Sequence, residues 1–244
     1  NKRAHWRGRR PGQPFFSVFN FTTTHESATR RQPHQAVQDS ATIQLPGYLP
    51  DLPEVRQGWA QSYDQMAVMD GQVGDVIQQL HNDGLADDTI IFYFGDHGPG
   101  FARAKRWPGN SGMQVPLIVY FPPRFRHLAP KGYAVAQGPN QSAVVQVGEG
   151  VASQELVGFV DLAPTLLSLA GAELPDYLQG RAFAGSKRAD PPAYLHGFRD
   201  RMDERYDLCR SVRDQQYVYI RNYYPRLPHG QHLSYLFQTP TTQA

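Results

Sequence analysis

The chain has 244 residues, 40% of them apolar and 19% charged, so it is long enough to bury the core of one large or two small domains. Its 24 basic and 22 acidic residues leave a formal charge of +2, which excludes a global field that attracts nucleic acid or membrane surfaces. The single cysteine, Cys209, excludes an internal disulfide framework, and no stretch approaches the roughly 20 apolar residues that cross a bilayer.

The first ten residues form a basic segment. It contains Lys2, Arg3, His5, Arg7, Arg9 and Arg10. Such a segment can bind phosphate or sulfate groups, or it can be a solvated helix end or linker. We expect a solvated helix end or linker. The opening residues have no apolar leader and no initiating Met, so we expect an internal piece of a longer protein.

An aromatic-rich run at residues 15–21 predicts a central strand, which leads into a polar segment with His25. Residues 28–58 are rich in Pro and Gln and predict a surface loop. Apolar residues at intervals of three and four predict a helix over residues 62–83, which Gly84 would end.

The run Thr89 to Phe94 predicts a buried strand that delivers Gly95-Asp96-His97-Gly98 to a sheet edge, in a parallel helix-to-strand unit over residues 62–96. A loop over residues 99–112 leads to a second predicted buried strand at 115–121, and residues 122–150 predict an excursion from the core.

Asp161 is placed as the N-cap of a short predicted helix at residues 162–171. Short runs beyond residue 185 predict a small antiparallel meander. We therefore expect an α/β domain over residues 1–184 and a small antiparallel subdomain over residues 185–244.

Three predicted strand ends offer His25, then Asp96 with His97, then Lys105 beside Arg103. A metal-bound oxyanion requires this mixture: a carboxylate for the cation, a cationic side chain for the anion, and an imidazole that can pass a proton to a leaving oxygen.

The sequence resembles the sulfatases of the alkaline-phosphatase superfamily in four stretches. They are Pro14-Phe15-Phe16 through His25, Gly95 to Gly98, the Lys105 loop into Gly112 to Ile118, and Val160-Asp161-Leu162-Ala163-Pro164-Thr165-Leu166-Leu167. Two further stretches, Arg199 to Asp207 and Val212 to Tyr223, are similar to the heparan N-sulfatase-like and arylsulfatase-like branch. The resemblance implies an alkaline-phosphatase-like α/β sheet with flanking helices, incomplete at its N-terminal side, and a small C-terminal antiparallel sheet.

Carried over by position, the resemblance makes Asp96 and His97 metal ligands. It makes Lys105 a contact of the sulfate oxygens, and His25 a contact of the bridging oxygen that helps to protonate the leaving group. Many sulfatases place Asn where this chain has His97. Calcium is the expected ion and manganese the second choice, since calcium prefers oxygen ligands and imidazole suits transition metals.

Two parts of the family's site are missing from the sequence: the formylglycine nucleophile in its C/S-x-P-x-R motif and an Asp pair near the amino terminus. The near match Cys209 to Arg213 has Ser211 where Pro is required, and we reject it. We expect a carboxy-terminal portion of a sulfatase that binds metal weakly, has no turnover alone, and needs the missing half to complete its site.

The resemblance implies a sulfated small molecule or glycan as substrate, no nucleic-acid partner, no membrane span, and a periplasmic, lysosomal or secreted location. One alternative is a phosphodiesterase or phosphonate monoester hydrolase of the same superfamily. Another is a non-catalytic module that binds sulfated polysaccharide through arginines and through the basic segment of the first ten residues. Those arginines are Arg199, Arg201, Arg205 and Arg213, and their ordinary role would be salt bridging to Asp200, Asp203, Glu204 and Asp207.

Overall fold

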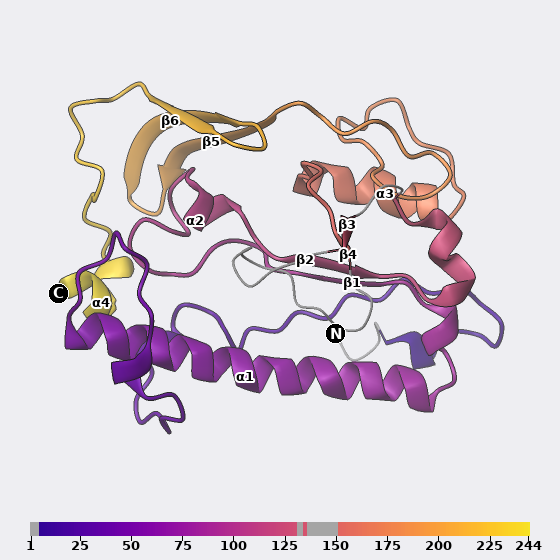
Figure 1. The fold of residues 1–244 in the computed structure, drawn as a ribbon, viewed down its shortest axis with the longest axis horizontal. Helices are drawn as coiled ribbons and strands as arrows, with labels where there is room; N and C mark the ends of the chain where they lie inside the picture. The colour runs from indigo at the N-terminus through magenta and orange to yellow at the C-terminus, as the bar shows by residue number, and fades with distance from the viewer. Residues whose placement is uncertain (1–4, 131–133, 136–150) are drawn as a thin grey trace. The chain divides into compact units, whose positions relative to one another are not determined.

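The computed structural model describes residues 5–130, 134–135 and 151–244 (Figure 1). These residues divide into two compact units, residues 1–77 with Ala244 and residues 78–243. The predicted boundary after residue 184 lies inside the second unit and stays a prediction. Lys2, Arg3 and most of the predicted excursion at 122–150 lie outside the described residues.

The first unit is organised by the long helix α1 (Pro53–Asn82), whose last turn belongs to the second unit. The predicted helix begins too late: α1 starts at Pro53, a residue well suited to a first helical turn, and Val55 in that turn is fully buried. The end of the predicted surface loop 28–58 is therefore helical.

The rest of the predicted surface loop is held against α1 by two buried side chains of the helix. The side-chain amide of Gln61 donates to the carbonyl oxygens of Ala28 (2.6 Å) and Arg31 (3.0 Å). The Asp64 carboxylate accepts the N–H groups of Val37 and Gln38 and the Nε2 proton of His34, which lies 2.8 Å away. Burial of such polar groups is tolerated because each one is paired.

The predicted central strand at residues 15–21 is wrong. These residues lie within the described part of the chain and pair with no strand there, and Phe16 is 72% exposed. High β-propensity produces a strand only where a neighbouring strand supplies hydrogen bonds, which local sequence cannot reveal.

The predicted end of α1 is confirmed. Gly84 has a φ of +68°, its N–H donates to the carbonyl of His81 (2.9 Å), and the N–H of Leu85 donates to the carbonyl of Leu80 (3.0 Å). This is the Schellman arrangement, in which glycine adopts the left-handed conformation without a steric cost.

The two strands that flank the candidate site form a small sheet of their own. β1 (Ile91–Phe94) pairs with β2 (Leu117–Tyr120), with Ile91 opposite Tyr120. The pairing is antiparallel, so the predicted parallel arrangement is wrong. The strands are also less buried than predicted, with Phe94 42% and Tyr120 48% exposed, because a two-stranded sheet cannot cover both of its faces.

The other elements near β1 and β2 are short. α2 (Asn110–Met113) lies in the loop between the two strands, and α3 (Leu162–Leu169) ends before Gly171, as predicted. Asp161 stands before α3, but its carboxylate does not cap the helix. It accepts the N–H groups of Gly158 (2.9 Å) and Arg181 (2.8 Å) instead, and so ties together two segments distant in sequence.

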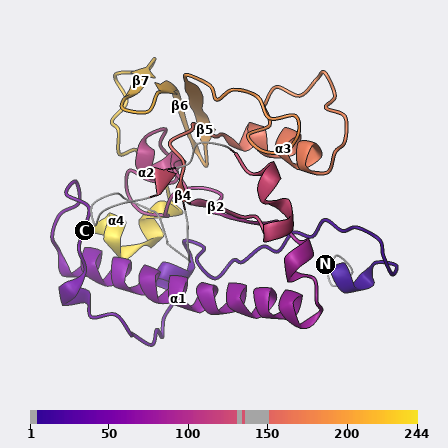
Figure 2. The same cartoon turned by 45° about the vertical axis from the view of Figure 1, so that its right-hand side comes forward.

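The predicted C-terminal meander is confirmed as an antiparallel sheet in the order β5-β6-β7. Its strands are β5 (Leu195–Met202), β6 (Arg205–Arg213) and β7 (Val218–Asn222), with β7 on an edge (Figure 2). The structure also contains the two-residue strands β3 (Ala134–Val135) and β4 (Val151–Ala152) and the terminal helix α4 (Pro240–Gln243). None of the described helices is both long and apolar enough to cross a membrane.

Candidate active site

The candidate site is built on the loop between β1 and β2. The N–H of Gly95 donates to the carbonyl of Pro116 (3.2 Å), and the N–H of Gly98 donates to the carbonyl of Gly112 (2.9 Å). These two bonds close the loop at its base, on either side of Asp96 and His97. The backbone of α2 lies so close to Gly98 that no side chain fits there, so the second glycine of Gly-Asp-His-Gly is a packing requirement.

Asp96 and His97 direct their side chains toward each other. The Oδ2 of Asp96 lies 3.5 Å from the Nε2 of His97, and the Asp96 side chain is 85% exposed. The Nδ1 of His97 lies 2.8 Å from the carbonyl oxygen of its neighbour Gly98. A carbonyl can only accept, so Nδ1 carries a proton, and in the neutral ring Nε2 is the nitrogen with the free lone pair.

This pair fits a divalent cation. Two ligands about 2.4 Å from a calcium ion and at right angles to each other are about 3.4 Å apart, close to the observed separation. A ligating histidine also commonly donates its other ring N–H to a backbone carbonyl, as His97 does. Within the residues that the structure describes, no three His, Cys, Asp or Glu side chains gather as a metal site, so no third side chain of these four types joins the pair there.

Lys105 lies in the same loop as the pair. Its backbone N–H donates to the carbonyl of Pro99 (3.1 Å), which folds the residue back toward the Gly98 end of the loop. The side chain is half-buried. Arg103, two residues earlier, is exposed and has a φ of 62°, and its carbonyl accepts the hydroxyl of Ser111 (2.5 Å).

Partial burial, and to a smaller extent the positive charges of Arg103 and Arg199, lower the pKa of His229, whose carbonyl accepts the indole N–H of Trp107.

His25 lies in the first of the two compact units, and only its surroundings within that unit are described. The ring is exposed, and its Nδ1 accepts the backbone N–H of Ser27 (3.3 Å), so in the neutral ring the proton resides on Nε2. The segment before His25 is held to α1 by the hydroxyl of Thr23, which donates to Gln72 (2.6 Å). Of the four predicted site residues, the structure brings Asp96, His97 and Lys105 together in one loop.

The arginines of the C-terminal sheet mostly engage protein groups. Arg199 is buried 3.7 Å from Asp207, and Arg205 donates to the carbonyl of His232 (2.7 Å). Arg201 and Arg213 donate to carbonyl oxygens of the nearby turns. The predicted partner Asp200 instead pairs with Arg210 (2.9 Å).

Cys209 is buried in β6, and burial, with a smaller effect of Asp207, raises the pKa of its thiol. A buried thiol with a raised pKa is a poor nucleophile, in agreement with the rejection of the Cys209 motif.

Two residues that the sequence did not single out, Arg106 and Trp107, anchor the Lys105 loop. Both side chains are buried, Arg106 against Asp203 and Trp107 in a cluster with Leu233 and Leu236. No periodicity or motif marks them, because their partners lie about a hundred residues away along the chain.

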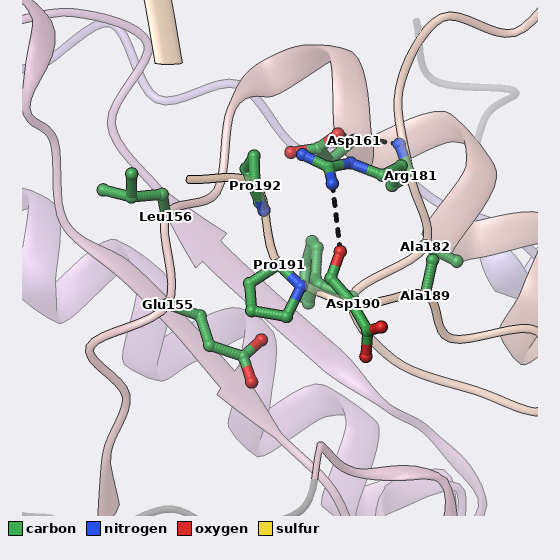
Figure 3. Close-up of a pocket in the computed structure, with 10 residues that line it drawn as sticks. Glu155, Leu156, Asp161, Arg181, Ala182, Ala189, Asp190, Pro191 and Pro192 are labelled. Carbon is green, nitrogen blue, oxygen red and sulfur yellow. Dashed lines mark hydrogen bonds between the residues drawn. The ribbon is translucent and has the colours of Figure 1, made fainter. Parts of the chain in front are cut away.

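A small pocket elsewhere in the second unit lies beside Asp161 and Arg181 (Figure 3). The guanidinium of Arg181 donates to the carbonyl of Asp190 (3.1 Å). The volume of about 10 Å³ admits about one water molecule, so this pocket is far too small for a sugar.

Comparison with known proteins gives consistent matches. The profile of the family named Sulfatase matches residues 4–172. The chain is 34% identical to an ulvan-active sulfatase of Formosa agariphila, over 98% of this chain and 43% of that protein. It is 27% identical to the human N-sulphoglucosamine sulphohydrolase, over 68% of this chain and 31% of that enzyme. It is 34% identical to the human iduronate 2-sulfatase, over 50% of this chain and 23% of that enzyme. The chain therefore spans less than half of the length of these relatives.

A solved structure supports the fold. It is the structure of a protein in complex with its substrate D-glucosamine-2-N,6-O-disulfate. This chain superposes on it with a TM-score of 0.51, at 20% sequence identity, over 69% of this chain and 32% of that protein. This likeness confirms the predicted alkaline-phosphatase-like α/β fold class.

Proposed function

The chain belongs to the sulfatase family, and we propose that it forms the carboxy-terminal part of the catalytic domain of an enzyme that hydrolyses sulfate esters or sulfamates of a sulfated glycan. The observation that supports this most directly is the Asp96–His97 pair, with its ring tautomer set by Gly98, in the stretch that the family profile matches. The relatives are named for activity on ulvan or on sulfated sugars, and this favours a glycan as the substrate.

In this proposal Asp96 and His97 hold a divalent cation, calcium first and manganese second. When bound there, the cation supplies positive charge beside the sulfate group. Asp96 contributes a carboxylate oxygen and His97 its Nε2 lone pair. Two protein ligands hold an ion weakly, so the remaining ligands would come from elsewhere in the protein.

Lys105 and His25 act on the substrate itself. The ammonium group of Lys105 contacts the sulfate oxygens and balances the negative charge that grows in the transition state. His25 contacts the bridging atom, and its Nε2 proton passes to the departing alcohol or amine. The proposal requires these two residues to face one pocket in the complete enzyme.

The nucleophile, a formylglycine in this family, is proposed to come from a part of the protein not included in these residues. The isolated chain is accordingly proposed to have no turnover. A periplasmic or secreted location is part of the same proposal.

Turnover by the complete protein tests the reaction class. An aryl sulfate and an aryl phosphodiester are offered side by side in the presence of calcium, with a Lys105→Ala variant as the control. We expect hydrolysis of the sulfate to be faster by orders of magnitude and to depend on Lys105. A preference for the phosphodiester would replace the sulfatase proposal by the phosphodiesterase alternative.

The binding-module alternative is less favoured, because the arginines that it requires contact protein groups. Retention of a heparin-like polymer by an Asp96→Ala/Lys105→Ala double variant would support that alternative.

A further inference from the structure

The residue after Lys105 is tied to the C-terminal sheet. The side chain of Arg106 is only 3% exposed, and its Nε donates to the Oδ2 of Asp203 at 2.6 Å. Asp203 lies in the tight turn that joins β5 to β6, almost a hundred residues further along the chain. The bond joins two charged groups, one of them buried, so it is among the stronger side-chain bonds that a protein can make.

The next residue, Trp107, is fixed as well. Its ring packs with Leu233 and Leu236, and its indole N–H donates to the carbonyl of His229 (2.9 Å). The guanidinium of Arg199, in β5, lies 5.1 Å from the centre of the ring. Two successive residues beside Lys105 are therefore anchored to the C-terminal part of the second unit.

Lys105 is also bonded to an earlier part of its own loop, close to the proposed metal ligands Asp96 and His97. Its backbone N–H donates to the carbonyl of Pro99, two residues after His97. The backbone of Lys105 is thus held between Pro99 and the anchored pair Arg106 and Trp107. A lysine side chain is long and has many rotamers, so the position of its backbone decides which atoms the ammonium group can reach.

We propose that Asp203 is a positioning residue for Lys105, acting through Arg106. This inference depends on the proposed function, in which the ammonium group of Lys105 binds the sulfate. The C-terminal sheet then does more than cover the domain: its β5–β6 turn sets the place of the anion-binding lysine.

The backbone at Asp203 permits a sharp set of variants. Its φ of 50° lies in the left-handed region, which Gly and Asn tolerate. Asp203→Gly removes the carboxylate and keeps the turn, whereas Asp203→Asn keeps an oxygen that can accept the Arg106 bond. Asp200→Ala is the matched control, because it breaks the exposed ion pair with Arg210 in the same hairpin.

The first measurement needs no turnover. The complete protein is labelled with trinitrobenzenesulfonate, and the modification rate of Lys105 is measured by peptide mass spectrometry against Lys187, which pairs with Glu173. We expect Asp203→Gly to change the rate at Lys105 several-fold, and Asp203→Asn and Asp200→Ala to leave it near the wild-type rate. An unchanged rate in Asp203→Gly, or an equal change in Asp200→Ala, would overturn the proposal.

The second measurement is kcat/KM for an aryl sulfate. Because a misplacement of about 1 Å can cost about a hundredfold, we expect Asp203→Gly to lose between about tenfold and a hundredfold and Asp203→Asn to recover most of it. Loss of thermal stability in Asp203→Gly with normal Lys105 labelling and kcat/KM would indicate a purely structural role and overturn the proposal. Absence of sulfate turnover in the wild type would instead refute the proposed function, and the labelling rates would still decide the role of Asp203.

Discussion

A Cβ atom at Gly98 would lie 1.8 Å from the carbonyl oxygen of Ser111. The neighbouring atoms belong to the backbone, so no side-chain rotation can relieve the clash. We therefore predict that Gly98→Ala destabilises the protein by about 3 kcal/mol or more and displaces Asp96 and His97. Thermal denaturation and calcium binding measure the two effects.

Gly95→Ala is the matched control for Gly98→Ala. Its Cβ would meet Val115 and Pro116 at 3.5 Å, which is ordinary contact. We expect near-normal stability and calcium binding in Gly95→Ala. Equal damage from both substitutions would show that the loop needs glycine for flexibility and not for the close approach of Ser111.

The second prediction concerns the ion. His97→Asn replaces an imidazole by an amide oxygen, a ligand that both calcium and manganese accept. We expect His97→Asn to keep the calcium and manganese affinities within about tenfold, whereas His97→Ala weakens both by more than that. Calorimetric titration of the complete protein measures these affinities. Unchanged calcium affinity in both His97→Ala and Asp96→Ala would refute the pair as ligands.

The third prediction is a pH dependence in the first unit. Burial alone would raise the pKa of Asp64, but hydrogen bonds from His34, Val37 and Gln38 outweigh burial and hold the pKa below the ordinary value of 3.8. The stabilisation is therefore present above pH 3.8 and lost as the pH falls through the lower pKa of the folded state.

Asp64→Asn tests this pH dependence. We expect it to lower the free energy of unfolding by about 1–3 kcal/mol at neutral pH and to remove part of the acid sensitivity. Asp70→Asn, an exposed change on the same helix, is the control and should have little effect. Identical acid unfolding of wild type and Asp64→Asn would contradict the assignment.

The fourth prediction concerns the buried pair of Arg199 and Asp207, whose side chains are 4% and 6% exposed. Asp207→Ala leaves a buried guanidinium without its counter-charge, and we expect a loss of about 3–5 kcal/mol. The double change Arg199→Met with Asp207→Leu should lose less, because no charge then stays buried. Chemical denaturation of the wild type and the two variants measures the difference, and a double variant less stable than Asp207→Ala would refute this account.

The candidate site shows how far local sequence can predict this fold. Gly-Asp-His-Gly after an apolar run correctly placed Asp96 and His97 in the loop after β1, and glycines 84 and 171 correctly ended two helices. The antiparallel pairing of β1 was not predictable, because hydrophobic runs report burial and length but not the direction of a partner strand.

The sequence by itself determined the local features of this protein: the periodic apolar face of α1, the left-handed glycine stops, and the motifs shared with the sulfatase family. These features depend on residues only a few positions apart, so the spacing and the chemical type of the amino acids are enough to predict them. Only the tertiary structure decided that residues 15–21 pair with no described strand, that Arg199 is buried, and that Asp203 holds Arg106 beside Lys105. Those outcomes depend on contacts between segments far apart in the chain, whose formation is set by packing and by the hydrogen bonds available in three dimensions.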